Sequence, residues 1–311
     1  VDNPHTKPLW FWEWLIAKVH RSHPDVVFLA EAFTRPAMMH ALGRAGFQQS
    51  YSYFTWRNTR DEIAEYLREV TAETAAFYRP NFFVNTPDIL TEFLQFGGPA
   101  AFKIRAVLAA LSNPMWGMYA GFELFEHVAR PGAEEYIDNE KYEYRPRDFA
   151  GAEARGASLA PYVTRLNRIR RAHPAFQDLQ NLVLHPADND GILAFSKSRR
   201  HLPDGQYRAP AGVALPVFPG VPDATALTES LPGRADTVIV VLNCDPHAAR
   251  EATVSLDLAA LDLDPADLDS EGRFEVEDLI TGARWRWGAD NYVRLDPAVE
   301  PAHVLKVVRG S

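Results

Sequence analysis

The sequence of 311 residues contains a single cysteine, Cys244, so no disulfide can form within the chain. One thiol without a partner fits a reducing compartment, and we expect a cytoplasmic protein. No apolar run reaches the roughly 18 residues of a membrane-spanning helix, and the nearest, at 9–19, is interrupted by Glu13 and Lys18. We therefore expect no membrane partner. The formal net charge is −9 and no dense run of lysine and arginine occurs, so we expect no nucleic-acid partner either.

A start residue is also missing. Val1 opens the sequence, and the letters VDN read as the end of a strand whose beginning is absent. We therefore expect a fragment, truncated at its N-terminus, of a longer protein.

Between residue 1 and residue 174, short apolar runs alternate with segments of helical periodicity. This alternation predicts a parallel sheet covered by helices. The run 26–29 is wholly apolar, as in a strand buried on both faces. Thr34 is the expected N-cap of the next helix. Trp10 and Trp14 share one face of a helix that opens at Pro8, and we expect them to pack against the sheet.

After Pro174 the pattern changes, because strand-like runs follow one another without helices between them. This predicts an antiparallel β-sandwich over residues 175–311. The expected strands are 181–185, 192–198, 237–243, 252–258, 274–279, 283–287, 292–295 and 303–308. Cys244 follows one of them and is expected to be a buried small apolar residue.

Three acidic residues, Asp2, Glu31 and Asp88, come where strand-like runs end, separated by 29 and then 57 residues. One strand–helix unit takes roughly 30 residues, so the intervals fit one unit and then two. A barrel of such units gathers its strand ends, and its catalytic groups, on one face. Converging carboxylates are the groups that break a glycosidic bond.

At these residues the chain resembles the α-amylase superfamily, and within it the α-1,4-glucan:maltose-1-phosphate maltosyltransferases of bacteria. The segments that carry the resemblance are VDNPHTKP (1–8), FLAEAFTRP (28–36), NFFVNTPDIL (81–90), NPMWGMYAGFELFE (113–126) and EKYEYRPRDF (140–149). The resemblance implies the C-terminal half of a (β/α)8 TIM barrel, about strands 4 to 8, over residues 1–174, followed by the β-sandwich domain. Where amylases have Asn-His-Asp, this chain has Asn85 and Asp88 separated by Thr86-Pro87.

The resemblance also implies a role for each carboxylate. Asp2 would be the nucleophile, Glu31 the general acid/base and Asp88 the transition-state stabiliser of a retaining transfer. The enzyme would move a maltosyl unit from maltose 1-phosphate to an α-1,4-glucan acceptor such as glycogen, releasing phosphate. It would use no metal and no organic cofactor. A homodimer is implied for the full-length protein, and an inactive chain for the fragment alone.

Four further residues are candidates for substrate binding: Asn3, Asn85, Lys141 and Tyr142. Asn3 contacts sugar or phosphate in one interpretation and is a turn residue in the other. Asn85 either orients Asp88 or satisfies backbone groups at a strand end. As alternatives for the function, another α-amylase-type hydrolase, a trehalose-forming isomerase and an inactive glucan-binding fragment stay open.

Overall fold

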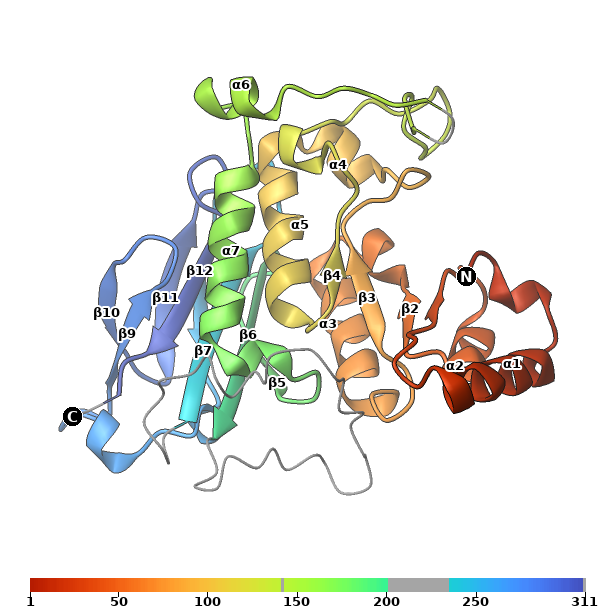
Figure 1. Ribbon diagram of the computed structural model, residues 1–311. Helices are drawn as coiled ribbons and strands as arrows, with labels where there is room; N and C mark the ends of the chain where they lie inside the picture. Colours follow the sequence, from red (N-terminus) through yellow and green to blue (C-terminus); the bar gives the residue numbers. More distant parts are fainter. Residues whose placement is uncertain (141–142, 201–234, 310–311) are drawn as a thin grey trace.

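The computed structural model describes residues 1–140, 143–200 and 235–309. An α/β part comes first and an antiparallel β part follows it, with the N-terminus at the far side of the first part (Figure 1). This order of element types confirms the coarse prediction of fold class. The boundary predicted between residues 174 and 175 stays a prediction.

The first part is built on a short parallel sheet with strand order β1-β2-β3-β4. Its strands are β1 Leu29–Ala30, β2 Gln49–Tyr51, β3 Pro80–Phe83 and β4 Trp116–Gly117. The helices are α1 Leu9–Ser22, α2 Pro36–Arg44, α3 Arg60–Arg68, α4 Glu92–Phe96, α5 Gly98–Ser112, α6 Phe149–Ala154 and α7 Ala160–Ala172. All strands of this sheet run in the same direction, so their carboxyl ends lie at one edge.

Local sequence explains several helix boundaries. Thr59 and Glu62 form a capping box at the start of α3, in which each side chain accepts from the backbone amide of the other residue. A short π-helical segment, Glu69–Glu73, continues α3. The predicted N-cap Thr34 is wrong, because the N-cap of α2 is Arg35 and Pro36 takes the first helical position.

The apolar run 26–29 is not buried on both faces as predicted. Val26, Val27 and Leu29 are each about two fifths exposed, and only Leu29 and Ala30 form a strand. β1 has β2 on one side, and on the other it meets only the few residues at the start of the chain. Side chains at such an edge keep part of their surface open to solvent.

The tryptophans of α1 also differ from the prediction. Trp10 and Trp14 are 67% and 51% exposed, whereas Trp12 is buried and donates from Nε1 to the carbonyl oxygen of Pro4 at 2.8 Å. The apolar stripe of α1 that faces the protein is therefore the one containing Trp12 and Ile16, which pack with Leu42 and Phe47.

The β part contains a sheet with strand order β10-β9-β12-β7-β6-β5 and a separate pair, β11-β8. Its strands are β5 Leu182–His185, β6 Ile192–Arg200, β7 Ala235–Asn243, β8 Arg250–Ser255, β9 Phe274–Asp278, β10 Arg284–Trp287, β11 Asp290–Leu295 and β12 Ala302–Val307. Every pairing within these sheets is antiparallel, as predicted.

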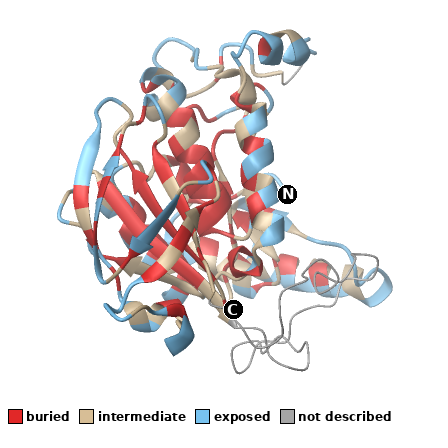
Figure 2. Cartoon of the chain, turned by 90° about the vertical axis from the view of Figure 1, so that its left-hand side faces the viewer, coloured by how far each residue is buried: buried red, intermediate tan, exposed pale blue. Residues whose placement is uncertain are grey.

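Strand β7 is buried on both faces, and this joins the two parts. Val238, Val240 and Leu242 belong to the core that includes the helices α5 and α7. Ile239 and Val241, which point the other way, belong to the core between the sheet and the β8–β11 pair. The buried residues accordingly run without a break from the helices into the sheet (Figure 2).

Candidate functional site

Asp2 and Glu31 lie opposite each other in a parallel β-bridge. The amide of Asn3 donates to the carbonyl oxygen of Glu31 at 3.0 Å, and the amide of Glu31 donates to the carbonyl oxygen of Val1 at 2.9 Å. Paired residues of neighbouring parallel strands point their side chains to the same face, with the strands ~4.8 Å apart. The backbone therefore brings these two predicted residues together.

Asp88 lies at the same edge of the sheet, in the loop that follows β3. Thr86 and Ile89 close a tight turn around it, and the Asp88 amide donates to Thr86 Oγ1 at 3.2 Å. β2 lies between β1 and β3, so the strands that precede Glu31 and Asp88 are two strand spacings, ~9.6 Å, apart. Its side chain is exposed.

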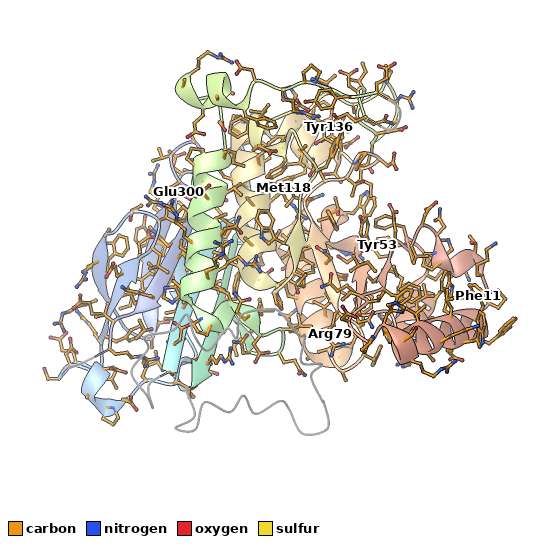
Figure 3. The ribbon with its side chains drawn as sticks, viewed as in Figure 1. Phe11, Tyr53, Arg79, Met118, Tyr136 and Glu300 are labelled. Carbon is orange, nitrogen blue, oxygen red and sulfur yellow. The ribbon has the colours of Figure 1, made fainter. Side chains whose placement is uncertain are left out.

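The two predicted asparagines have defined partners. Asn3 has a left-handed backbone (φ 45°), and its Nδ2 donates to Asp2 Oδ1 at 2.7 Å. Asn85 is fully buried: its Nδ2 donates to the Tyr136 hydroxyl at 2.7 Å, and its Oδ1 accepts from the Tyr119 amide at 2.8 Å. Asn3 thus orients a carboxylate from within a turn, and Asn85 ties the end of β3 to two later segments. Tyr136 is labelled on that side of the sheet in Figure 3.

Lys141 and Tyr142, the remaining predicted binding residues, lie outside the described residues. Their neighbour Glu140 has a left-handed backbone (φ 55°), and its carboxylate accepts from the Tyr119 hydroxyl at 2.6 Å and from Arg147 Nη1 at 2.7 Å. The loop on either side of the pair is therefore anchored by described contacts.

Several aromatic side chains lie at the sheet edge near Glu31. Tyr51 is at the end of β2, beside Glu31, and burial followed by the Glu31 charge raises the pKa of its hydroxyl. Its ring centre is 4.4 Å from that of Phe83 and 5.9 Å from that of Phe33. The ring centre of Trp56 is 5.4 Å from that of Phe33. These rings give the edge an apolar lining of the kind that sugar rings pack against.

Gly117 shows how closely this lining is packed. A Cβ added at this position would lie 2.4 Å from the Phe83 ring, so only glycine fits beside it. The sequence did contain a signal for this lining. Tyr51 and Phe83 are the last residues of β2 and β3, and the ends of strands are where the catalytic carboxylates were predicted.

The described part of the chain contains neither a candidate metal site nor a candidate membrane-spanning helix. No group of three or more histidine, cysteine, aspartate or glutamate side chains is placed to hold a metal ion there. None of the helices described is both long and apolar enough to cross a membrane.

The fold is similar to that of solved α-amylases. The structure superposes on an Anoxybacillus α-amylase with a TM-score of 0.65 at 16% identity, covering 100% of this chain and 58% of the amylase. An α-amylase from Geobacillus thermoleovorans, solved with acarbose, matches with a TM-score of 0.61 at 13% identity, covering 98% of this chain and 58% of the other. At this identity the likeness concerns the fold alone.

Sequence comparison is more specific. The chain is 51% identical over 306 residues to an α-1,4-glucan:maltose-1-phosphate maltosyltransferase of Corynebacterium glutamicum, covering 98% of this chain and 40% of the relative. It is 50% identical to a second such protein of Streptomyces coelicolor, covering 100% of this chain and 41% of the relative. Residues 224–307 match the family described as "GLGE, C-terminal". Relatives about 50% identical over nearly the whole chain are thus maltosyltransferases, and the chain spans about two fifths of the length of these curated relatives.

Proposed function

We propose that the complete gene product transfers a maltosyl unit from α-maltose 1-phosphate to the non-reducing end of an α-1,4-glucan and releases phosphate. The observation that carries the proposal is the bridge between Asp2 and Glu31, with Asp88 at the same sheet edge. The printed names of relatives at about 50% identity support the choice of donor and acceptor.

In the first step, an Asp2 carboxylate oxygen attacks the anomeric carbon of the donor. The bond from that carbon to the phosphate oxygen breaks, and Glu31 gives its proton to the departing oxygen. Two carboxyl groups about 5–5.5 Å apart suit this retaining route, and neighbouring parallel strands are ~4.8 Å apart. Asn3 holds Asp2 in place through its 2.7 Å hydrogen bond.

In the second step, the Glu31 carboxylate takes the proton of the acceptor's 4-hydroxyl. The freed oxygen attacks the anomeric carbon, and the bond to Asp2 breaks. Two inversions restore the α configuration, so the glucan grows by one maltosyl unit. Asp88 holds sugar hydroxyls more tightly as positive charge develops on the ring. The steps need neither a metal nor an organic cofactor.

The same proposal assigns the sheet a place in a larger fold. β1 to β4 are the fifth to eighth strands of a (β/α)8 barrel over residues 1–174, and Asp2 ends the fourth; residues 175–311 are the β-sandwich domain. The exposed apolar side chains of Val26, Val27 and Leu29 fit a surface that the rest of a barrel covers. The 311-residue chain alone is then expected to be inactive, and the full protein to be a cytoplasmic homodimer.

The test incubates the complete gene product with α-maltose 1-phosphate and glycogen. We expect phosphate release in equal amount to the maltosyl units transferred, and chains lengthened in steps of two glucoses. Free reducing sugar without phosphate release would identify a hydrolase instead, and conversion of maltose to trehalose an isomerase.

A further inference from the structure

Arg147 lies in a half-buried cluster of charges beyond the proposed catalytic carboxylates. It is only 5% exposed and forms ion pairs with Glu126 at 2.9 Å and with Glu140 at 2.7 Å. Its Nη2 donates to the second Glu126 oxygen at 3.1 Å, so this pair is bidentate. A planar guanidinium held by two carboxylates fixes the relative position of the segments that carry them.

Glu140 extends this cluster to the parallel sheet. Its carboxylate also accepts from the hydroxyl of Tyr119, whose amide donates to the buried side chain of Asn85. Asn85 precedes Asp88 by three residues in the loop after β3. The contacts therefore run without a gap from Glu126 to the loop of a proposed catalytic residue.

The segment between Glu126 and Arg147 touches the sheet edge at a second place. The Trp56 indole donates to Glu134 Oε2 at 2.8 Å, and the Leu90 amide donates to the Glu134 carbonyl oxygen at 2.5 Å. Trp56 packs on Phe33, two residues after Glu31. Residues 126–140 and 143–147, which we term the wall segment, thus contact both the Glu31 side and the Asp88 side of the site.

Glu140 makes these bonds from an unfavourable backbone conformation. Its left-handed backbone is unfavourable for a residue with a side chain. Hydrogen bonds from Tyr119 and then Arg147 lower the pKa of its carboxyl to about 2. The carboxylate is therefore charged throughout the neutral range, and the ion pair with Arg147 persists there.

We propose that Arg147 is a positioning residue, which holds the wall segment against the sheet edge and thereby sets the affinity of the site for its sugar donor. This inference rests on the proposed function for the identity of the donor. It assigns Arg147 no contact with the substrate.

The test compares Arg147→Met with Arg284→Met in the complete gene product. Arg284 is a matched control, because it also bridges two glutamates, Glu275 at 2.9 Å and Glu277 at 2.7 Å, but on β10 of the β part. Hydrogen exchange of the amides at 129–140 measures the wall segment directly. We expect about tenfold faster exchange there in Arg147→Met and none of that change in Arg284→Met.

Kinetics give the second measurement. Misplacing a binding surface by about 1 Å can cost up to about a hundredfold in rate, and we expect KM for maltose 1-phosphate to rise about tenfold in Arg147→Met with a smaller change in kcat. Arg147→Lys keeps the charge, so its KM for maltose 1-phosphate should lie between those of wild type and Arg147→Met. If Arg147→Met does not fold, Tyr119→Phe removes one bond of the same network and should shift KM in the same direction.

Faster exchange with an unchanged KM would overturn the link to donor affinity, and unchanged exchange would overturn the positioning role. A wild-type protein that releases no phosphate from maltose 1-phosphate would instead refute the proposed function. The hydrogen-exchange experiment would still test whether Arg147 positions the wall segment, since it requires no substrate.

Discussion

The Arg105 guanidinium lies 3.9 Å from the centre of the Phe54 ring and donates from Nη2 to the carbonyl oxygen of the same residue at 2.6 Å. Its Nη1 donates to the carbonyl oxygen of Arg57 at 2.5 Å, and the side chain is 2% exposed. A buried arginine of α5 thus satisfies the carbonyls of the turn that carries Trp56 to the site edge.

Arg105→Met is therefore expected to destabilise the protein. The change leaves two carbonyl oxygens without their donor, each costing about 1–3 kcal/mol when buried. Thermal unfolding should show a lower midpoint, and hydrogen exchange should quicken at residues 53–57. Lys103→Met, on the same helix, is the control, because the half-buried Lys103 donates to the carbonyl oxygen of Val299 instead. Equal midpoints for Arg105→Met and wild type would contradict the role of Arg105.

The buried Lys197 predicts a pH dependence of stability. Its Nζ donates to the carbonyl oxygens of Asp178 at 2.6 Å and Ser112 at 3.3 Å, and burial lowers its pKa from 10.5 to about 7. Between these values the unfolded lysine binds a proton that the folded one does not. Lys197 therefore makes the free energy of unfolding increase as pH rises from about 7 towards 10.5.

The quantity to measure is the thermal midpoint of wild type minus that of Lys197→Met. We expect this difference to be larger at pH 9 than at pH 7. Lys306→Met is the control, since Lys306 is partly exposed and pairs with Glu277 at 3.3 Å. If the difference between wild type and Lys197→Met is the same at both pH values, the lysine does not titrate in this window.

Cys244 is expected to be inert in the folded protein. It is 6% exposed, as its predicted apolar role requires, and burial raises the pKa of its thiol to about 12. Because the thiolate is the reactive form, iodoacetamide at pH 8 should label Cys244 only after denaturation. Peptide mapping that found rapid labelling of this residue in the native protein would contradict its burial.

Glu31→Gln tests the acid/base assignment. Loss of a general acid costs typically 10²–10⁴ in rate, and we expect a loss of about that size with maltose 1-phosphate. A maltosyl fluoride donor needs little protonation of its leaving group, so its first step should be affected far less. Equal losses with both donors would indicate that Glu31 does not protonate the departing group. Glu13→Gln, at an exposed position of α1, serves as the control carboxamide.

Much of the fold could be predicted because local sequence patterns indicate its strands and helices. The alternation up to residue 174 and the successive strands after it both correspond to observed elements. Asp2 and Glu31 could be predicted to be neighbours because parallel strands end at one edge. Their catalytic roles, and that of Asp88, stay predictions.

Exposure could not be predicted in the same way. Trp10, Trp14 and Val27 are apolar residues whose burial depends on what packs against them, and the sequence pattern does not report this. The ion pairs of Arg147 could not be predicted from the sequence for another reason. Glu126 is 21 residues away along the chain and is brought to Arg147 only by the path of the loop.

The central claim is that Asp2 and Glu31 act on one sugar ring, and trapping the glycosyl-enzyme tests it most directly. A maltosyl fluoride bearing fluorine at the 2-position should react with the complete gene product and remain attached, because the electron-withdrawing fluorine slows breakdown of the intermediate. Mass spectrometry of the digested protein is predicted to find the maltosyl adduct on Asp2. An adduct on a different carboxylate would contradict the account.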